Sequence, residues 1–172
     1  RTRRRTGALR PGASELAGHA LVPTGRLGPD QLLDTLDGIR EAGTPGDLFV
    51  CGAGRGGTGV LLRAYLEAHE LDDRHVWVAD RFRADEHADL NVVRDAFDRF
   101  GLLDDRVHLL QGEPAATLPD APPQELALLH LGALGADDVT AALGHLYPRL
   151  AVGAVVVVED QGDPAVAAAV AS

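Results

Sequence analysis

Apolar residues along this chain follow two patterns, short continuous runs and longer segments with an apolar residue every three or four positions. The continuous runs, each of which predicts a buried β-strand, are residues 48–51, 75–80, 107–111, 126–131 and 154–158. Helical spacing is found within residues 29–43, 60–66, 90–100 and 137–146. Because strands and helices alternate, the pattern predicts a mainly parallel, doubly wound α/β sheet whose ligand site lies at the carboxyl ends of the strands.

The two ends of the chain differ from this middle part. Residues 1–28 are rich in Gly, Pro and Arg and are predicted to be a flexible tail and loop, while residues 29–172 are predicted to form one domain. Residues 164–171 are too few to decide between a helix and a loop. Since the chain of 172 residues does not begin with methionine, we expect it to be a piece of a longer protein.

Four glycines follow the first predicted strand, in the stretch Cys51-Gly52-Ala53-Gly54-Arg55-Gly56-Gly57-Thr58. Glycine adopts backbone angles that are closed to other residues, and its missing Cβ lets a ligand approach the peptide N–H groups. The stretch therefore predicts a strand, a tight turn and a helix start that together cradle a nucleotide-type ligand. A glycine-rich turn that only reverses the chain is the alternative.

An acidic residue in the right place supports the ligand-binding interpretation. The predicted strand 75–80 ends in Asp80, 23 positions after Gly57. A doubly wound fold places at this point a carboxylate that accepts hydrogen bonds from a ribose. The glycine turn and Asp80 together therefore predict a site for an adenosine-containing ligand.

The composition excludes several classes of function. Acidic residues outnumber basic ones, 26 to 16, and the formal net charge is −10. Nucleic acids and anionic membranes need a basic footprint, so neither is expected to be the main partner, and the basic start Arg1-Thr2-Arg3-Arg4-Arg5 is interpreted as a disordered tail. No apolar run approaches the roughly 20 residues that span a bilayer, and no signal peptide is visible, so we expect a soluble, cytoplasmic protein. One cysteine excludes an internal disulfide.

Several phrases then carry a family resemblance. In order and spacing the chain resembles the TylF-like macrocin O-methyltransferases, which use S-adenosylmethionine to methylate sugar hydroxyls of macrolides and other natural products. The resemblance covers about residues 29–160. The phrases that carry it are Gly46-Asp47-Leu48 to Arg55-Gly56-Gly57, Val76-Trp77-Val78-Ala79-Asp80, Phe100-Gly101-Leu102-Leu103-Asp104-Asp105-Arg106-Val107, Thr117-Leu118-Pro119 and Leu146-Tyr147-Pro148-Arg149-Leu150.

The resemblance implies a class I methyltransferase fold, Rossmann-like, with S-adenosylmethionine as cofactor. It implies that the loop glycines lie along the methionine and ribose part of the cofactor, that Asp80 binds the ribose hydroxyls with Arg81 beside it, and that Gln111-Gly112 lies near the adenine. The loop glycines concerned are Gly52, Gly54, Gly56 and Gly57. It also leads us to expect a sheet without the final antiparallel strands of the family, so that another segment, a second copy or a fused domain must cover its edge.

A magnesium site is implied by the same resemblance, but it is expected to be incomplete. In relatives an aspartate after the strand corresponding to 126–131 and two acids after the strand corresponding to 154–158 hold the metal. The two acids are kept as Glu159 and Asp160, whereas Gly132 stands at the position of the aspartate, followed by Ala133 and Leu134. Asp137 and Asp138 are either shifted replacements or, as we prefer, the acidic start of the next helix. An acid of the family before the Cys-Gly turn is also replaced, by Val50.

Two residues are candidates for the chemistry itself. His87, in the short segment 81–87, is either a catalytic base or a solvated loop residue, and Asp160 is the second catalytic candidate. His130 is interpreted as a packed or hydrogen-bonded core residue.

Three hypotheses about function remain open at this point. The first is an O-methyltransferase that acts on a small-molecule hydroxyl. The second is an inactive methyltransferase-fold domain that binds a ligand or a partner domain. The third is a dinucleotide-binding domain, which agrees less well with the family motifs that flank the glycine turn. In the first case the protein mainly aligns a reactive sulfonium with a deprotonated nucleophile, which does not strictly need a metal.

Overall fold

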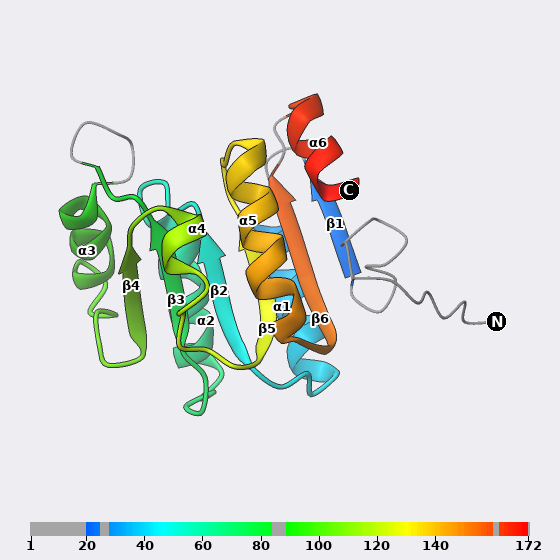
Figure 1. Ribbon diagram of the computed structural model, residues 1–172. Helices are drawn as coiled ribbons and strands as arrows, with labels where there is room; N and C mark the ends of the chain where they lie inside the picture. The colour runs from blue at the N-terminus through cyan, green and yellow to red at the C-terminus, as the bar shows by residue number, and fades with distance from the viewer. Residues whose placement is uncertain (1–19, 25–27, 84–88, 160–161, 172) are drawn as a thin grey trace.

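The computed structural model describes residues 20–24, 28–83, 89–159 and 162–171. Its strands form one sheet in the order β1-β6-β5-β2-β3-β4, and each neighbouring pair is parallel (Figure 1). The strands are β1 (Ala20–Thr24), β2 (Asp47–Cys51), β3 (Val76–Asp80), β4 (Val107–Gln111), β5 (Leu126–Leu131) and β6 (Leu150–Glu159). The parallel α/β fold predicted from the alternation of patterns is confirmed.

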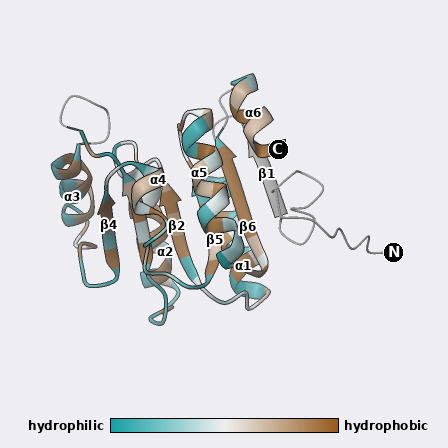
Figure 2. Cartoon of the chain, in the orientation of Figure 1, coloured by the Kyte–Doolittle hydropathy of each residue, from teal (hydrophilic) through white to brown (hydrophobic). Residues whose placement is uncertain are grey.

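Helices cover both faces of the sheet. One face packs against α1, α2 and α3, and the other against α5 and α6, so that two buried apolar clusters are separated by the strands (Figure 1). The helices are α1 (Pro29–Glu41), α2 (Gly57–Ala68), α3 (Leu90–Asp98), α4 (Pro114–Thr117), α5 (Ala136–Leu146) and α6 (Pro164–Ala171), with a 3-10 turn η2 (Tyr147–Arg149). In Figure 2 the central strands are mostly hydrophobic while the helices carry mixed colours, as expected for strands that are buried on both sides.

Strand β1 corrects the expectation for the N-terminal part of the chain. Ala20–Thr24 pairs in parallel with β6, so this segment belongs to the sheet and not to a tail. Its position at the outer edge suits Pro23, because a residue without an N–H is tolerated where only one side of the strand is paired. The edge of β6 that was expected to need cover is thus covered by the same chain.

Helix α3 begins as its sequence suggests but ends earlier. The side chain of Asp89 caps it, accepting hydrogen bonds from the backbone N–H groups of Asn91 at 2.7 Å and Val92 at 3.3 Å. Val93 and Phe97 are buried, whereas Phe100, which continues the apolar spacing, lies past the helix end and is 67% exposed. Within the described part of the chain no helix combines the length and apolarity needed to cross a bilayer.

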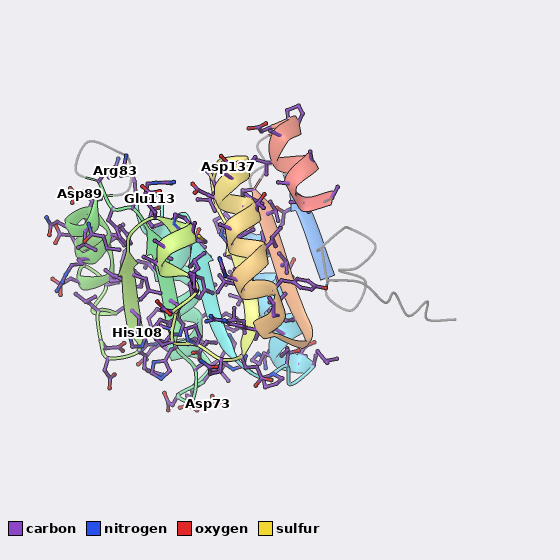
Figure 3. All side chains as sticks on the ribbon, in the orientation of Figure 1. Asp73, Arg83, Asp89, His108, Glu113 and Asp137 are labelled. Atoms are coloured by element: carbon purple, nitrogen blue, oxygen red, sulfur yellow. The ribbon has the colours of Figure 1, made fainter. Side chains whose placement is uncertain are left out.

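Two histidines, a tryptophan and an aspartate form a cluster away from the carboxyl ends of the strands. The Nδ1 atom of His75 lies 2.8 Å from Nε2 of His108, and the ring of His108 stacks on Trp77 with 3.9 Å between centroids. Asp47 accepts hydrogen bonds from the indole N–H of Trp77 at 2.8 Å and from the backbone N–H of His75 at 2.9 Å. The cluster ties β2, β3 and β4 together at the opposite end from Glu113 and Arg83 (Figure 3).

This cluster is expected to make the folded state less stable in mild acid. Burial, and then the nearby His75, lower the pKa of His108 below its ordinary value of 6.5. The unfolded chain therefore binds more protons than the folded chain below that pH, and stability present above pH 6.5 is lost as the pH falls through the lowered pKa. Carboxyls with lowered pKa values, such as those of Asp37 and Asp104, titrate at more acidic pH and do not enter this window.

Urea unfolding at about pH 7.5 and about pH 5.5 measures the effect, with a lower unfolding midpoint expected at the acidic pH. The variant His108→Gln removes the titrating group, so its midpoint should change less between the two conditions. An equal change in the variant and the unmodified chain would contradict the assignment to His108.

Candidate functional site

The glycine loop runs from the carboxyl end of β2 to the start of α2. Gly52, Gly54 and Gly56 have φ angles of +87°, +52° and +89°, in the left-handed region that residues with a side chain rarely adopt. Gly56 is the N-cap of α2 and Gly57 its first residue. A Cβ added at Gly54 or Gly57 would meet no atom within 4 Å, so these two positions border open space. The loop therefore has the form of a backbone cradle at a helix N-terminus.

Asp80 lies directly against this loop. Its Oδ2 atom accepts a hydrogen bond from the backbone N–H of Ala53 at 2.7 Å, and the N–H of Gly52 donates to the carbonyl of Ala79 at 2.9 Å. Asp80 is only partly buried, so its carboxylate keeps capacity to accept further hydrogen bonds. The structure thus brings together the two features that the sequence suggested, while the role of Asp80 in ribose binding stays a prediction.

Residues after β4 also lie beside Asp80. The N–H of Gly112 donates to the carbonyl of Asp80 at 3.0 Å, and the side-chain amide of Gln111 reaches the carbonyl of Phe82 at 3.4 Å. A side chain at Gly112 would collide with Thr117, so this glycine also has a packing reason. Gln111 and Gly112 are therefore next to the predicted ribose site, and their contact with an adenine stays a prediction.

The end of β5 presses against the start of the glycine loop. The N–H of Gly132 donates to the carbonyl of Cys51 at 2.8 Å, and a Cβ built on Gly132 would lie 2.6 Å from the carbonyl oxygen of Gly52. Real Cβ atoms do not come that close to a backbone oxygen. Leu134 approaches from the same side, since a Cβ built on Gly52 would lie 3.1 Å from its Cδ2 atom. Position 132 is therefore occupied by glycine for a steric reason.

Cys51, the last residue of β2, is inert. Its side chain is fully buried, and burial, followed by the carboxylates of Asp80 and Asp138, raises the pKa of the thiol to about 12. The thiol is protonated at neutral pH, and it is therefore no nucleophile.

The predicted metal ligands have other partners or lie outside the described residues. Glu159, at the end of β6, is 3.3 Å from Nε2 of His130, and both side chains are largely buried. His130 is thus a packed core residue with a charged partner, in agreement with its interpretation from the sequence. Asp160 and His87 fall outside the described ranges, so their catalytic and metal-binding roles stay predictions. Over the described ranges, no three His, Cys, Asp or Glu side chains are grouped closely enough to hold a metal ion.

Arg81 joins three segments at the carboxyl edge. Its guanidinium binds Asp138 with two hydrogen bonds, at 2.6 and 2.9 Å, and its Nε donates to Glu113 at 2.7 Å. Asp137 and Asp138 lie in the first turn of α5, as we preferred, and the partner of Asp138 is this arginine. Asp138 first, and then Glu113, raise the pKa of Arg81, which is charged at any relevant pH.

Sequence reasoning missed two members of this site. The N–H of Ala53 is a backbone group that no side-chain pattern identifies. Glu113 follows Gln111-Gly112 at the end of a predicted strand, and the convergence of parallel strands at one edge was a signal that could have placed it near Arg81. Figure 3 shows Glu113 and Arg83 together beyond the end of β4, and Asp137 at the start of α5.

Comparisons with known proteins agree with one another. The sequence profile of the family described as Macrocin-O-methyltransferase (TylF) matches residues 1–90 and 85–172. The 8-demethyl-8-(2,3-dimethoxy-alpha-L-rhamnosyl)-tetracenomycin-C 4'-O-methyltransferase of Streptomyces olivaceus is 38% identical, over 83% of this chain and 62% of its own length. The Mycinamicin III 3''-O-methyltransferase of Micromonospora griseorubida is 32% identical, over 86% and 66%. The chain therefore spans less than two thirds of the length of these curated relatives.

A solved structure has the same fold. The structure of the O-methyltransferase NovP superimposes with a TM-score of 0.78 at 30% sequence identity, covering 83% of this chain and 68% of that protein. Together with the strand order, this confirms the predicted class I methyltransferase fold.

Proposed function

We propose, since the chain belongs to the macrocin-O-methyltransferase (TylF) family, that it forms the cofactor-binding part of an S-adenosylmethionine-dependent O-methyltransferase. The relatives named above methylate hydroxyls in natural-product tailoring, and we assign to this chain the same class of acceptor, a hydroxyl on a sugar-bearing small molecule. The proposed partners of the chain are this small-molecule acceptor and either a partner domain or a second copy of the chain.

One observation carries the cofactor assignment. The N–H of Ala53 and the carboxylate of Asp80 are joined at 2.7 Å, beside open space over Gly54 and Gly57. This arrangement presents the backbone of a glycine loop at a helix N-terminus and a partly buried carboxylate at the same edge of the sheet, which supports the proposal of an adenosyl ligand. The residues therefore fit the cofactor.

The chain's contribution to the reaction is alignment. When bound, S-adenosylmethionine supplies a methyl group on a sulfonium that reacts readily with an oxygen nucleophile. The glycine loop and Asp80 fix the orientation of the ligand, and orientation of this kind accounts for much of the rate in a direct displacement. His87 or Asp160 is proposed to accept the proton of the acceptor hydroxyl.

We propose further that the reaction needs no magnesium. Gly132 offers no ligand, Glu159 is paired with His130, and Asp138 is bound to Arg81. Two carboxylates rarely hold magnesium without further oxygens, and the side chains paired with these acids compete with a metal. The described residues do not fit a magnesium site.

Calorimetry with S-adenosylmethionine is the test of this function. Saturable binding to the unmodified chain is expected, and the dissociation constant should be the same with magnesium and with a chelator. Absence of binding at millimolar cofactor would reject the proposed function. A magnesium-dependent gain in affinity that Asp160→Ala abolishes would instead show that the metal site is intact.

A second candidate function is a methyltransferase-fold module that binds without transferring methyl groups. Leu134 favours it, because this apolar side chain lies against Gly52 of the glycine loop and offers no polar group to a cofactor or an acceptor. Transfer of a labelled methyl group to a deoxysugar-bearing acceptor distinguishes the two, since binding without transfer would select the module.

A further inference from the structure

We infer that Arg81, neutralised by Asp138 and Glu113, makes the site select an adenosine whose ribose carries free hydroxyls over one whose ribose carries a phosphate. This inference rests on the proposed function, because it assumes that an adenosyl ligand binds beside Asp80. It concerns the specificity of that site and assigns a role to a group of charges that the proposed reaction does not use.

The position of Arg81 makes it decisive for what the ribose site accepts. Arg81 follows Asp80 directly. The chain then turns sharply at Phe82, which has a φ of +49°. The side chain of Phe82 is buried in the apolar cluster that includes residues of α1 and α2. Such a conformation in a residue with a large side chain is uncommon and clusters at functional sites. The guanidinium of Arg81 lies toward α5, on the opposite face of the sheet from Phe82.

The guanidinium reaches over the end of β2. Arg81 follows β3, and Asp138 belongs to the helix that follows β5, while β2 lies between β3 and β5 in the sheet. Two strand spacings amount to about 10 Å. The side chains of Arg81 and Asp138 together span this distance and meet in hydrogen bonds of 2.6 and 2.9 Å. Asp80, the residue before Arg81, accepts a hydrogen bond from the N–H of Ala53 at 2.7 Å, two residues after the end of β2 at Cys51, which places this group of charges beside the start of the glycine loop.

The charges of the group cancel. Arg81 is bound by Asp138 and Glu113, and Glu113 also binds Arg83 at 2.8 Å, so two positive and two negative side chains form one network. An arginine close to the ribose acid is the device by which nucleotide-binding folds accept a 2′-phosphate. Here the hydrogen-bonding edges of that arginine are occupied by carboxylates, so the neutral network does not attract a phosphate, and the carboxylate of Asp80 would meet it as a like charge.

The experiment measures the ratio of two dissociation constants. S-adenosylmethionine is first bound to the unmodified chain, and adenosine and adenosine 2′-phosphate are then used as competitors in calorimetry. We expect adenosine to bind at least about tenfold more tightly than adenosine 2′-phosphate, a preference of about 1.4 kcal/mol. In Asp138→Asn the guanidinium of Arg81 loses its bidentate partner, so this preference should fall by about fivefold or more.

Two variants make the result specific. Asp137→Asn removes the same charge from the same helical turn, at an exposed side chain, and should leave the preference unchanged. The double variant Arg81→Gln with Asp138→Asn should recover the preference, because the freed guanidinium is then absent. Thermal unfolding of each variant without ligand shows that it is folded.

The outcomes separate the two proposals. If S-adenosylmethionine fails to bind the unmodified chain, the proposed function and this inference both fall. If it binds, but Asp138→Asn keeps the preference of the unmodified chain or changes it no more than Asp137→Asn does, the inference alone is overturned.

Discussion

Replacing Gly132 with aspartate is expected to lower the free energy of unfolding by about 1–3 kcal/mol and to leave the protein without a magnesium-dependent activity. A Cβ at this position would lie 2.6 Å from the carbonyl oxygen of Gly52, and the nearby atoms are backbone atoms that no side-chain rotation can clear. The hydrogen bond from Gly132 to Cys51 at 2.8 Å fixes the same segment. Placing at this position the acid that the resemblance implies should therefore displace the loop that is proposed to hold the cofactor.

Ala133→Asp is the matched control, because it adds the same side chain one position later at an exposed residue. Urea unfolding of the two variants should show a large loss for Gly132→Asp and a small one for Ala133→Asp. Calorimetry with S-adenosylmethionine should show weaker binding only for Gly132→Asp. A stable Gly132→Asp variant that gains affinity when magnesium is added would show that the site is only one side chain short of the family's arrangement.

Much of the fold could be predicted because burial on both faces gives continuous apolar runs. The runs 107–111 and 126–131 coincide with β4 and β5, and β3 takes up all of the run 75–80 except its first residue. The family resemblance drawn from five phrases is likewise confirmed by the match of the family profile along the chain. Strands that are buried on both sides leave the clearest pattern in a sequence.

The elements that were not predicted are the short or outer ones. Strand β1 lies in a Gly- and Pro-rich region of the sequence. It is a strand because it pairs with β6, and a local sequence pattern does not reveal pairing between distant segments. Helix α4 has four residues, too few for a periodic pattern. Phe100 continued the apolar spacing of α3, but Gly101 has a φ of +66° and the chain leaves the helix before Phe100 can pack.

The candidate site divides in the same way. The glycine loop and Asp80 could be predicted because backbone conformation limits which residues are allowed there, and the structure places them in contact. The pairing of Arg81 with Asp138 and of Glu159 with His130 could not, because charge pairs between segments far apart in sequence depend on the packing of α5 and β6. The dinucleotide-binding hypothesis is set aside, since the chain belongs to a methyltransferase family.

Asp80→Asn is expected to weaken binding of S-adenosylmethionine by about 100-fold, because hydrogen bonds to a charged group contribute roughly 1.5–3 kcal/mol each. The substitution keeps the shape of the side chain but removes the charge, and an amide NH₂ in place of one oxygen would either face the N–H of Ala53, now 2.7 Å from Oδ2, or remove an acceptor for the ribose hydroxyls. Calorimetry measures the loss.

Asp73→Asn, an exposed acid at the opposite end of the sheet, removes the same charge and should bind as the unmodified chain does (Figure 3). Should both variants bind the cofactor equally well, the carboxylate of Asp80 would serve only to hold the glycine loop, and the adenosyl group would have to bind elsewhere at the carboxyl edge.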